Sequence, residues 1–202
     1  MKRGWQGYIA HIATALCLVA PLQAVADRPA EQIVEQACKR CHGLTGLSSK
    51  PEFPKLAGQN VDYLTRQMAN FKTGVRTSKR MQRKVEGLSG GEMRALAEYF
   101  SAQELIPERG GRAPLVEAGR RIYYAGKPAD SITACVICHG PDGRGAMYLP
   151  RLAGQHAEYL RSQLKAFREH SRSSQNMVMH TVIETISDAD IEAVAEFLSV
   201  KE

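Results

Sequence analysis

The sequence has no cysteine to spare for a structural disulfide. It contains five cysteines among 202 residues, and one of them, Cys17, falls in an apolar segment near the N-terminus. The other four lie in two copies of one pentapeptide, Cys-x-x-Cys-His. Exported proteins commonly pair their thiols in disulfides. Because all four of these thiols lie in the two pentapeptides, we expect them to be consumed by bonds other than structural disulfides.

Beyond the first 26 residues the chain also has no long apolar run. A short basic start is followed by the mostly apolar stretch 9–20 and by small residues just before Asp27. This order predicts a cleaved secretory signal over 1–26. The alternative, a retained anchor, has too short an apolar run for a bilayer span of about 20 residues. We expect an exported, soluble protein with at most peripheral membrane association.

A strong excess of one charge is missing as well. Lys and Arg number 27 against 21 Asp and Glu, a formal net charge of +6 that falls to about +4 without the predicted signal. The basic residues are spread along the chain rather than gathered in a stripe, and runs such as 79–84 are typical of solvated faces. This pattern argues against nucleic acid as a partner.

No stretch shows the alternation of a β-strand, and the chain reads as one helical unit written twice. The stretch 54–59, Pro-Lys-Leu-Ala-Gly-Gln, recurs as Pro-Arg-Leu-Ala-Gly-Gln at 150–155. We therefore predict an all-α protein of two small tandem domains, each a helical bundle wrapped around a bound group. The boundaries that composition suggests are 27–103 for the first domain, 104–114 for a Pro- and Gly-containing linker, and 115–202 for the second.

Each predicted domain ends in an amphipathic helix with a capping box. Ser89 pairs with Glu92, and Ser187 pairs with Asp190. The apolar residues that follow have helical spacing and should face the two cores: Met93, Leu96, Ala97 and Phe100, and Ile191, Val194, Ala195 and Leu198. In the opening helices, expected at 29–38 and 114–125, only the second has a Gly and an aromatic four residues apart, Gly119 and Tyr123. That pair suits a close crossing with the final helix, so the first domain must pack its crossing differently.

The two pentapeptides carry the chemistry. Two thiols one helical turn apart can add to both vinyl groups of a haem, and the adjacent imidazole can then bind the iron. The pattern predicts covalent haem c attachment through Cys38 and Cys41 with His42 on the iron, and through Cys135 and Cys138 with His139. A single copy would also fit a redox thiol pair or half of a zinc site. Two copies in a shared sequence context favour two haems.

A sixth iron ligand is expected in the polar loop before each final helix. Met81 lies eight residues before Ser89, and Met179 lies eight residues before Ser187. A thioether opposite His is typical of electron-carrying cytochromes. Met177 is the runner-up in the second loop, with Met147 a weaker candidate. Three histidines, His156, His170 and His180, are expected to have surface or structural roles.

Pro54 and Pro150 have two interpretations. A metal-bound His usually donates its other ring N–H to a neighbouring acceptor, which fixes the ring. A proline carbonyl in a stiff loop could accept it. Each proline could equally be a turn breaker before the Leu-Ala-Gly-Gln segment, and the residues alone leave both open.

With these motifs, the chain from about 29 to 200 resembles the two-haem cytochromes of the cytochrome c4 family, which are built from two class I cytochrome c domains. The resemblance rests on both Cys-x-x-Cys-His motifs, the Pro-x-Leu-Ala-Gly-Gln repeats, Tyr-Leu-x-x-Gln in the next helix, and Met ahead of Leu-Ser or Ile-Ser. It implies His42 with Met81 on one iron and His139 with Met179 on the other. It also implies that the Pro54 and Pro150 carbonyls accept from the ligand imidazoles.

The resemblance further implies a periplasmic, non-enzymatic carrier of single electrons in a respiratory chain. The donor would be a quinol-oxidising complex or another cytochrome, and the acceptor a haem-copper terminal oxidase. Two alternatives stay open: a haem enzyme such as a di-haem peroxidase, and a subunit of a sulfur-compound or dehydrogenase complex.

Overall fold

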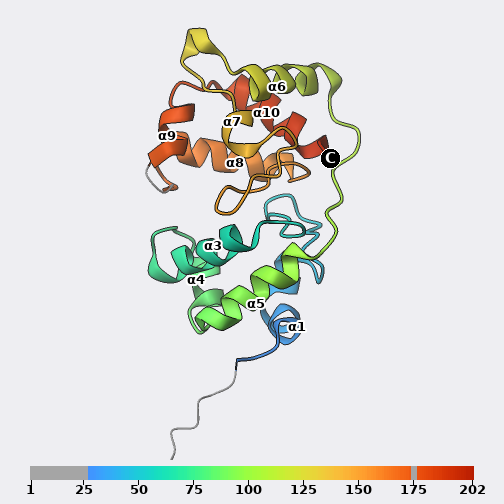
Figure 1. Ribbon diagram of the computed structural model, residues 1–202, viewed down its shortest axis with the longest axis vertical. Coiled ribbons are helices and arrows are strands. Elements are labelled where there is room, and N and C mark those ends of the chain that lie inside the picture. Colours follow the sequence, from blue (N-terminus) through green and yellow to red (C-terminus); the bar gives the residue numbers. More distant parts are fainter. Residues whose placement is uncertain (1–26, 174–176) are drawn as a thin grey trace, which may run out of the picture.

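The computed structural model describes residues 27–173 and 177–202 and shows two helical domains stacked along the long axis of the molecule (Figure 1). The predicted signal 1–26, Cys17 included, lies outside the described residues. No β-strand is present in the described ranges, where extended backbone pairs only at two isolated bridges. The all-α prediction is confirmed.

Each domain follows the same order of helices along the chain, although the first domain begins with a continuous helical segment. The first domain contains α1 (Ala30–Ile33), the π-helical turn η1 (Val34–Cys38), α2 (Lys39–His42), α3 (Val61–Thr73), α4 (Lys79–Val85) and α5 (Gly90–Ser101). The second contains α6 (Ala113–Ala125), the 3₁₀ turn η2 (Pro128–Asp130), α7 (Val136–His139), α8 (Ala157–Arg168), α9 (Val178–Ile183) and α10 (Asp188–Val200). None of the helices in the described residues is both long and apolar enough to cross a bilayer.

The final helices form as the sequence predicts. Both capping boxes are present, with the Ser89 and Ser187 side chains accepting from the backbone N–H groups of Glu92 and Asp190. All eight predicted stripe residues are buried. These two helices, α5 and α10, therefore supply one wall of each core.

The two opening helices cross the final helices in different ways, as expected. In the second domain, a Cβ built on Gly119 would lie 2.0 Å from the carbonyl oxygen of Ala193 and 2.8 Å from the Phe197 Cβ, so only glycine permits this approach. Tyr123 is fully buried beside it, with its ring 5.5 Å from that of Phe197. The first domain has no such glycine, and Ile33 and Val34 fill the corresponding space against α5.

Two buried glutamines join the domains in a reciprocal pattern. The side-chain amide of Gln59 donates to the Arg151 carbonyl (2.9 Å) and its oxygen accepts from the Arg151 N–H (2.8 Å). Gln155 makes the same two bonds, each 2.8 Å long, to the backbone of Lys55. Because 59 and 155 are equivalent positions of the repeat, the domains meet about a pseudo-two-fold axis.

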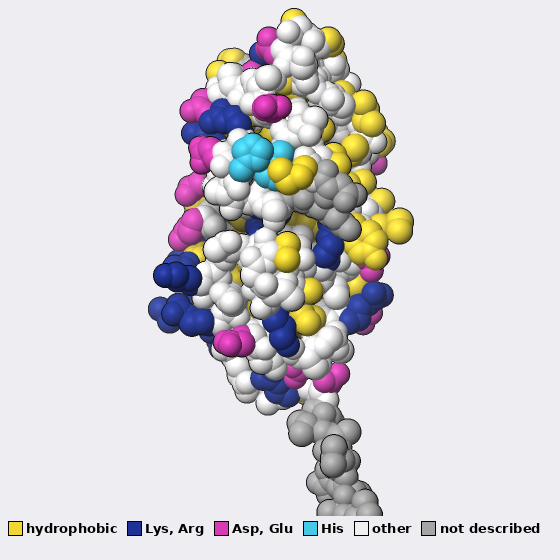
Figure 2. All heavy atoms as spheres, turned by 90° about the vertical axis from the view of Figure 1, so that its left-hand side faces the viewer, with side chains coloured by type: hydrophobic (Ala, Val, Ile, Leu, Met, Phe, Trp, Pro, Cys, Tyr) yellow, Lys and Arg dark blue, Asp and Glu magenta, His cyan; other side chains and the backbone are white. Residues whose placement is uncertain are grey.

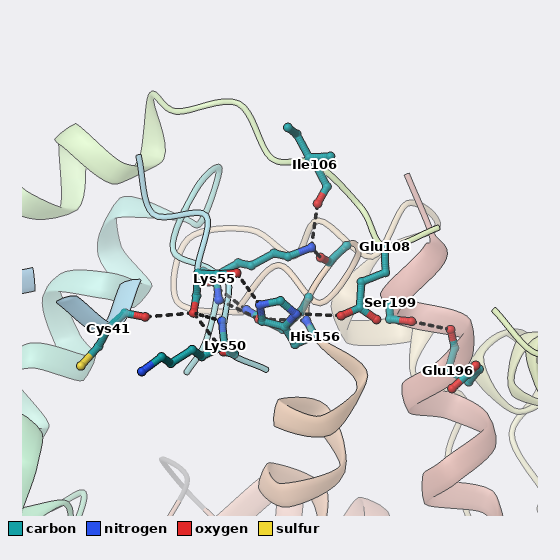
Figure 3. A network of polar contacts seen from close by, with 11 residues as sticks. Cys41, Lys50, Lys55, Ile106, Glu108, His156, Glu196 and Ser199 are labelled. Atoms are coloured by element: carbon teal, nitrogen blue, oxygen red, sulfur yellow. Dashed lines mark hydrogen bonds and ion pairs between the residues drawn. The ribbon is translucent and has the colours of Figure 1, made fainter. Parts of the chain in front are cut away.

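His156 forms a further link at this junction, where a loop of the first domain meets the linker (Figure 3). It is buried, with Nε2 2.9 Å from the Ser48 carbonyl oxygen and Nδ1 2.7 Å from Glu108 Oε1. Nearby, Lys55 Nζ donates to the carbonyls of Ile106 (2.7 Å) and Gly154 (3.0 Å). His156 thus has a structural position.

Candidate functional site

One continuous cavity of about 1120 Å³ runs through both domains and across their junction. Its walls include both Cys-x-x-Cys-His motifs, which the sequence separates by almost a hundred residues. Pockets for drug-sized ligands usually measure about 300–1,000 Å³. This volume therefore suits more than one bound group, with the two sites sharing a wall at the domain interface.

The two pentapeptides are held in the same local geometry. Each ends in a short helix, α2 or α7, and each is closed by a glycine of positive φ, Gly43 (75°) or Gly140 (76°). His42 and His139 are buried and line the cavity. The repeat thus places two thiols and one imidazole at the cavity wall in each domain.

A proline carbonyl fixes each of these imidazoles. His42 Nδ1 lies 2.9 Å from the Pro54 oxygen, and His139 Nδ1 lies 3.1 Å from the Pro150 oxygen. A carbonyl oxygen can only accept, so in each ring Nδ1 carries the proton and Nε2 keeps its lone pair. Burial lowers the pKa of both rings, more than the proline hydrogen bonds raise it. Both imidazoles are therefore neutral and have a free Nε2, which is the form that binds a metal.

The four candidate methionines differ in whether they line the cavity. Met81 and Met179 line the cavity, whereas Met177 and Met147 do not. The latter two are exposed, with 48% and 67% of their surface accessible, and both have positive φ. Of these four candidate ligands, therefore, Met81 and Met179 are the two placed to reach a group bound in the cavity.

The prediction that these methionines sit in polar loops is wrong. Met81 lies in the first turn of α4, where the Ser78 hydroxyl accepts from the Met81 N–H (3.3 Å), and Met179 lies in α9. The sequence signal was weak because these helices are only seven and six residues long. The helical turns hold each sulfur in a defined position relative to the core.

The described residues give no support to the two rival uses of the thiols, a redox pair and a zinc site. Burial raises the pKa of Cys38 and of Cys135 to about 11, whereas reactive redox thiols need a lowered pKa. In the described parts of the chain, no three His, Cys, Asp or Glu side chains are grouped so that they could hold a metal ion. Covalent attachment of a group through thioether bonds requires neither.

A cluster of arginine and tyrosine side chains, which the sequence reasoning missed, lies where the domains share the cavity. Arg76 donates to the Tyr159 hydroxyl (2.9 Å) and to Gln163 Oε1 (2.9 Å), and Arg172 donates to the Tyr63 hydroxyl (2.9 Å). Each pair joins opposite domains, and all five side chains line the cavity. The repeat held a signal, since both arginines lie five residues after the Phe that ends the matched segment.

The positive charge of the two guanidinium groups favours binding of an anion at this cluster. No ion pair links Arg76 or Arg172 to a carboxylate of the described residues, and Arg172 Nε is buried without a hydrogen-bond partner. Burial by itself would raise the pKa of Tyr159, but the two guanidinium groups outweigh it and lower the pKa. Buried charges are normally paired. The carboxylate side chains of haem would pair with these guanidinium groups, so the residues present fit two haems.

Comparison with known proteins identifies relatives over nearly the whole chain. Family models match both domains: the cytochrome c model at residues 116–200, and the model of subunit III of cbb3-type cytochrome c oxidase at residues 25–100. Cytochrome c4 from Azotobacter vinelandii is 39% identical over 190 residues, covering 87% of this chain and 89% of the relative.

Two further matches bear on structure and function. The crystal structure of reduced recombinant cytochrome c4 from Pseudomonas stutzeri superposes with a TM-score of 0.79 at 33% identity, covering 88% of this chain and 100% of that one. A protein named thiosulfate dehydrogenase electron acceptor, from Thiomonas intermedia, is 35% identical and covers 82% of this chain and 78% of its own length.

Proposed function

Since this chain belongs to the cytochrome c4 family of di-haem electron-transfer proteins, with two covalently bound haem c groups, we propose that it is a periplasmic carrier of single electrons in a respiratory chain. Its donor would be a quinol-oxidising complex or another cytochrome, and its acceptor a haem-copper terminal oxidase. The proposal includes export by a cleaved signal at 1–26 and domain boundaries at 27–103, 104–114 and 115–202.

The observation that supports this proposal is that each domain contributes to the cavity wall the imidazole of its Cys-x-x-Cys-His motif and a methionine of its short helix α4 or α9. We assign His42 and Met81 to the first iron, and His139 and Met179 to the second. Met179 is preferred to Met177 because only Met179 lines the cavity. Cys38 with Cys41, and Cys135 with Cys138, would attach the two porphyrins.

When bound, each haem iron supplies reversible exchange of one electron. The chain's own residues set the conditions for that exchange. The Pro54 and Pro150 carbonyls hold the two imidazoles in one tautomer and increase their basicity. As soft and neutral ligands, the two thioethers would favour the ferrous form of the iron and raise its reduction potential. If one imidazole and one thioether held each iron, no position would remain for a substrate, as is expected of a carrier.

Absorption spectroscopy of the purified protein tests this assignment. We expect the weak long-wavelength ferric band that methionine coordination produces, and no binding of carbon monoxide by the reduced protein. A high-spin ferric haem that binds peroxide would instead support a haem enzyme. The two readouts are independent of any physiological partner.

A second function is favoured by a specific relative, the thiosulfate dehydrogenase electron acceptor at 35% identity. In that function the chain would accept electrons from a thiosulfate-oxidising enzyme, with the same iron ligands. Reduction of both haems by thiosulfate together with such an enzyme, at a rate that saturates with this chain, would support it. Rapid reduction by a quinol-oxidising complex, with none by the thiosulfate system, would support the respiratory role.

A further inference from the structure

The two domains differ sharply in charge although their cores match. Residues 27–103 contain 13 Lys and Arg against eight Asp and Glu, whereas residues 104–202 contain 12 against 13. Each haem brings the same pair of carboxylates, so the difference between the domains persists in the loaded protein. Figure 2 views the side that carries α4 and α9, and Lys and Arg side chains are spread over its lower half, which is the first domain.

Much of this charge surrounds the first haem site. We define the α4 face as five basic residues on α2 and α4: Arg40, Lys79, Arg80, Arg83 and Lys84. All five are exposed, and within the described residues none of them forms an ion pair. Two of them, Arg80 and Lys84, also line the cavity. The α4 face therefore forms the rim of the first site.

At the second site, no charged side chain stands at the positions equivalent to the α4 face. Val136 and Ile137 stand between its two cysteines, where the first domain has Lys39 and Arg40. Ile137 is 71% exposed. The helix that carries Met179, α9, reads Val-Met-His-Thr-Val-Ile and contains no Lys, Arg, Asp or Glu, whereas α4 contains four Lys and Arg and no acid.

Water solvates these exposed charges, but like charges gathered on one face also repel one another and create a positive potential that attracts a surface of opposite charge. We propose that the α4 face is the docking surface for a redox protein whose own docking surface is rich in carboxylates, so that this partner exchanges electrons at the first haem site. The inference rests on the proposed carrier function and adds which site the partner meets and what charge its surface has. Charge complementarity of this kind steers encounter and fixes the orientation of the complex.

The test uses the holoprotein and plant plastocyanin, a small acidic copper protein, as the probe. Titration followed by amide NMR shifts gives both the affinity and the residues in contact. Lys79→Glu with Arg83→Glu reverses two charges that do not line the cavity. We expect binding at least about tenfold weaker, since charge complementarity controls such complexes. Arg120→Glu with Arg121→Glu, on α6, is the matched control with the same change of net charge, and should weaken binding by less than about threefold.

Arg40→Glu is a second variant that leaves α4 intact, and it should weaken binding by about threefold. Equal weakening by the α4 and α6 variants, or shifts centred on Ile137 and α9, would overturn the proposal. A result against the carrier function itself can be told apart from a result against this docking surface, because the reduced wild-type protein would then bind carbon monoxide. Retention of the methionine band and of both reduction potentials in each variant shows that the haem sites are intact.

Discussion

The helices that carry the two methionines, α4 and α9, are equivalent in the repeat but opposite in character. The first is basic and lies over the first haem site, whereas the second is apolar and is anchored by a buried histidine, His180. The glutamines and tyrosines at the domain interface, in contrast, occur in both halves at matching positions. The residues that join the domains thus match in the two halves, whereas the outer surfaces differ, so that each domain can make a different contact.

The largest expected effect tests whether the two methionines are equivalent ligands. Met81→Ala and Met179→Ala should each lower one of the two reduction potentials by on the order of 0.1 V or more, within the roughly 0.8 V range that axial ligation spans. Met177→Ala is the control and should change neither, because Met177 does not line the cavity. A potentiometric titration measures all three. A lowered potential in the Met177 variant would show that Met177, and not Met179, binds the second iron.

A clash at the close helix crossing should destabilise the second domain alone. Gly119→Ala would place a methyl group 2.0 Å from the Ala193 carbonyl oxygen, and we expect a loss of about 3 kcal/mol in the free energy of unfolding. Gly90→Ala at the start of α5 is the control, since nothing lies within 4 Å of its Cβ. It should be neutral or stabilising by less than about 1 kcal/mol. Urea unfolding followed by circular dichroism compares them, and equal stabilities would contradict the close crossing.

The pseudo-two-fold interface predicts equal effects at its two ends. Gln59→Ala and Gln155→Ala each remove one buried amide that makes two bonds to the backbone of the other domain. Each should reduce the free energy of unfolding by about 2–3 kcal/mol, because a buried N–H and a buried carbonyl lose their partners. Differential scanning calorimetry reads both. If only one variant were destabilised, the interface would not be symmetric.

Loss of the His180 side chain should destabilise the protein, whereas loss of Gln82, the equivalent residue of the first domain, should not. Its Nδ1 donates to the Phe167 carbonyl (2.7 Å), which ties α9 to the end of α8, and its ring stacks on His170 at 4.6 Å. His180→Ala should cost about 2 kcal/mol of stability and weaken the methionine band of the second haem. Gln82 follows Met81 as His180 follows Met179 and is exposed. Gln82→Ala should therefore stay within about 0.5 kcal/mol of the wild type.

The smallest effect concerns the acid stability of the first capping box. A hydrogen bond from Arg28 holds the pKa of Glu92 at about 2, below its ordinary value of 4.5. A lowered pKa stabilises the fold above pH 4.5, and this contribution disappears as the pH falls from about 4.5 to 2. Glu92→Gln should thus flatten the acid side of the stability profile over this range. Thermal unfolding at several pH values measures it, and an unchanged profile would contradict the assignment.

Local patterns in the sequence were sufficient for much of the fold. The capping boxes, the apolar stripes and the Gly119 crossing depend on residues within a few turns of one helix, so their spacing predicts them. The sequence predicts an iron ligand in the segment before each final helix and leaves both Met177 and Met179 open in the second, whereas the structure shows that Met179 lines the cavity and Met177 does not. The helical state of these two segments escaped prediction because helices of seven and six residues leave little periodicity.

The interface could not be predicted, because its contacts join residues that are far apart in the chain. Arg76 and Tyr159 are 83 residues apart, and Gln155 and Lys55 are 100 apart. No spacing rule connects such pairs. The only available signal was that the same polar residues occur at matching positions of both repeats, which indicates a shared role without naming the partner.

Proton NMR of the fully reduced protein tests whether each iron lies between one imidazole and one thioether. The methyl group of a methionine bound to ferrous haem lies over the porphyrin and gives a strongly upfield-shifted singlet. The account predicts two such singlets, one lost in Met81→Ala and the other in Met179→Ala. A single singlet, or none, would contradict it.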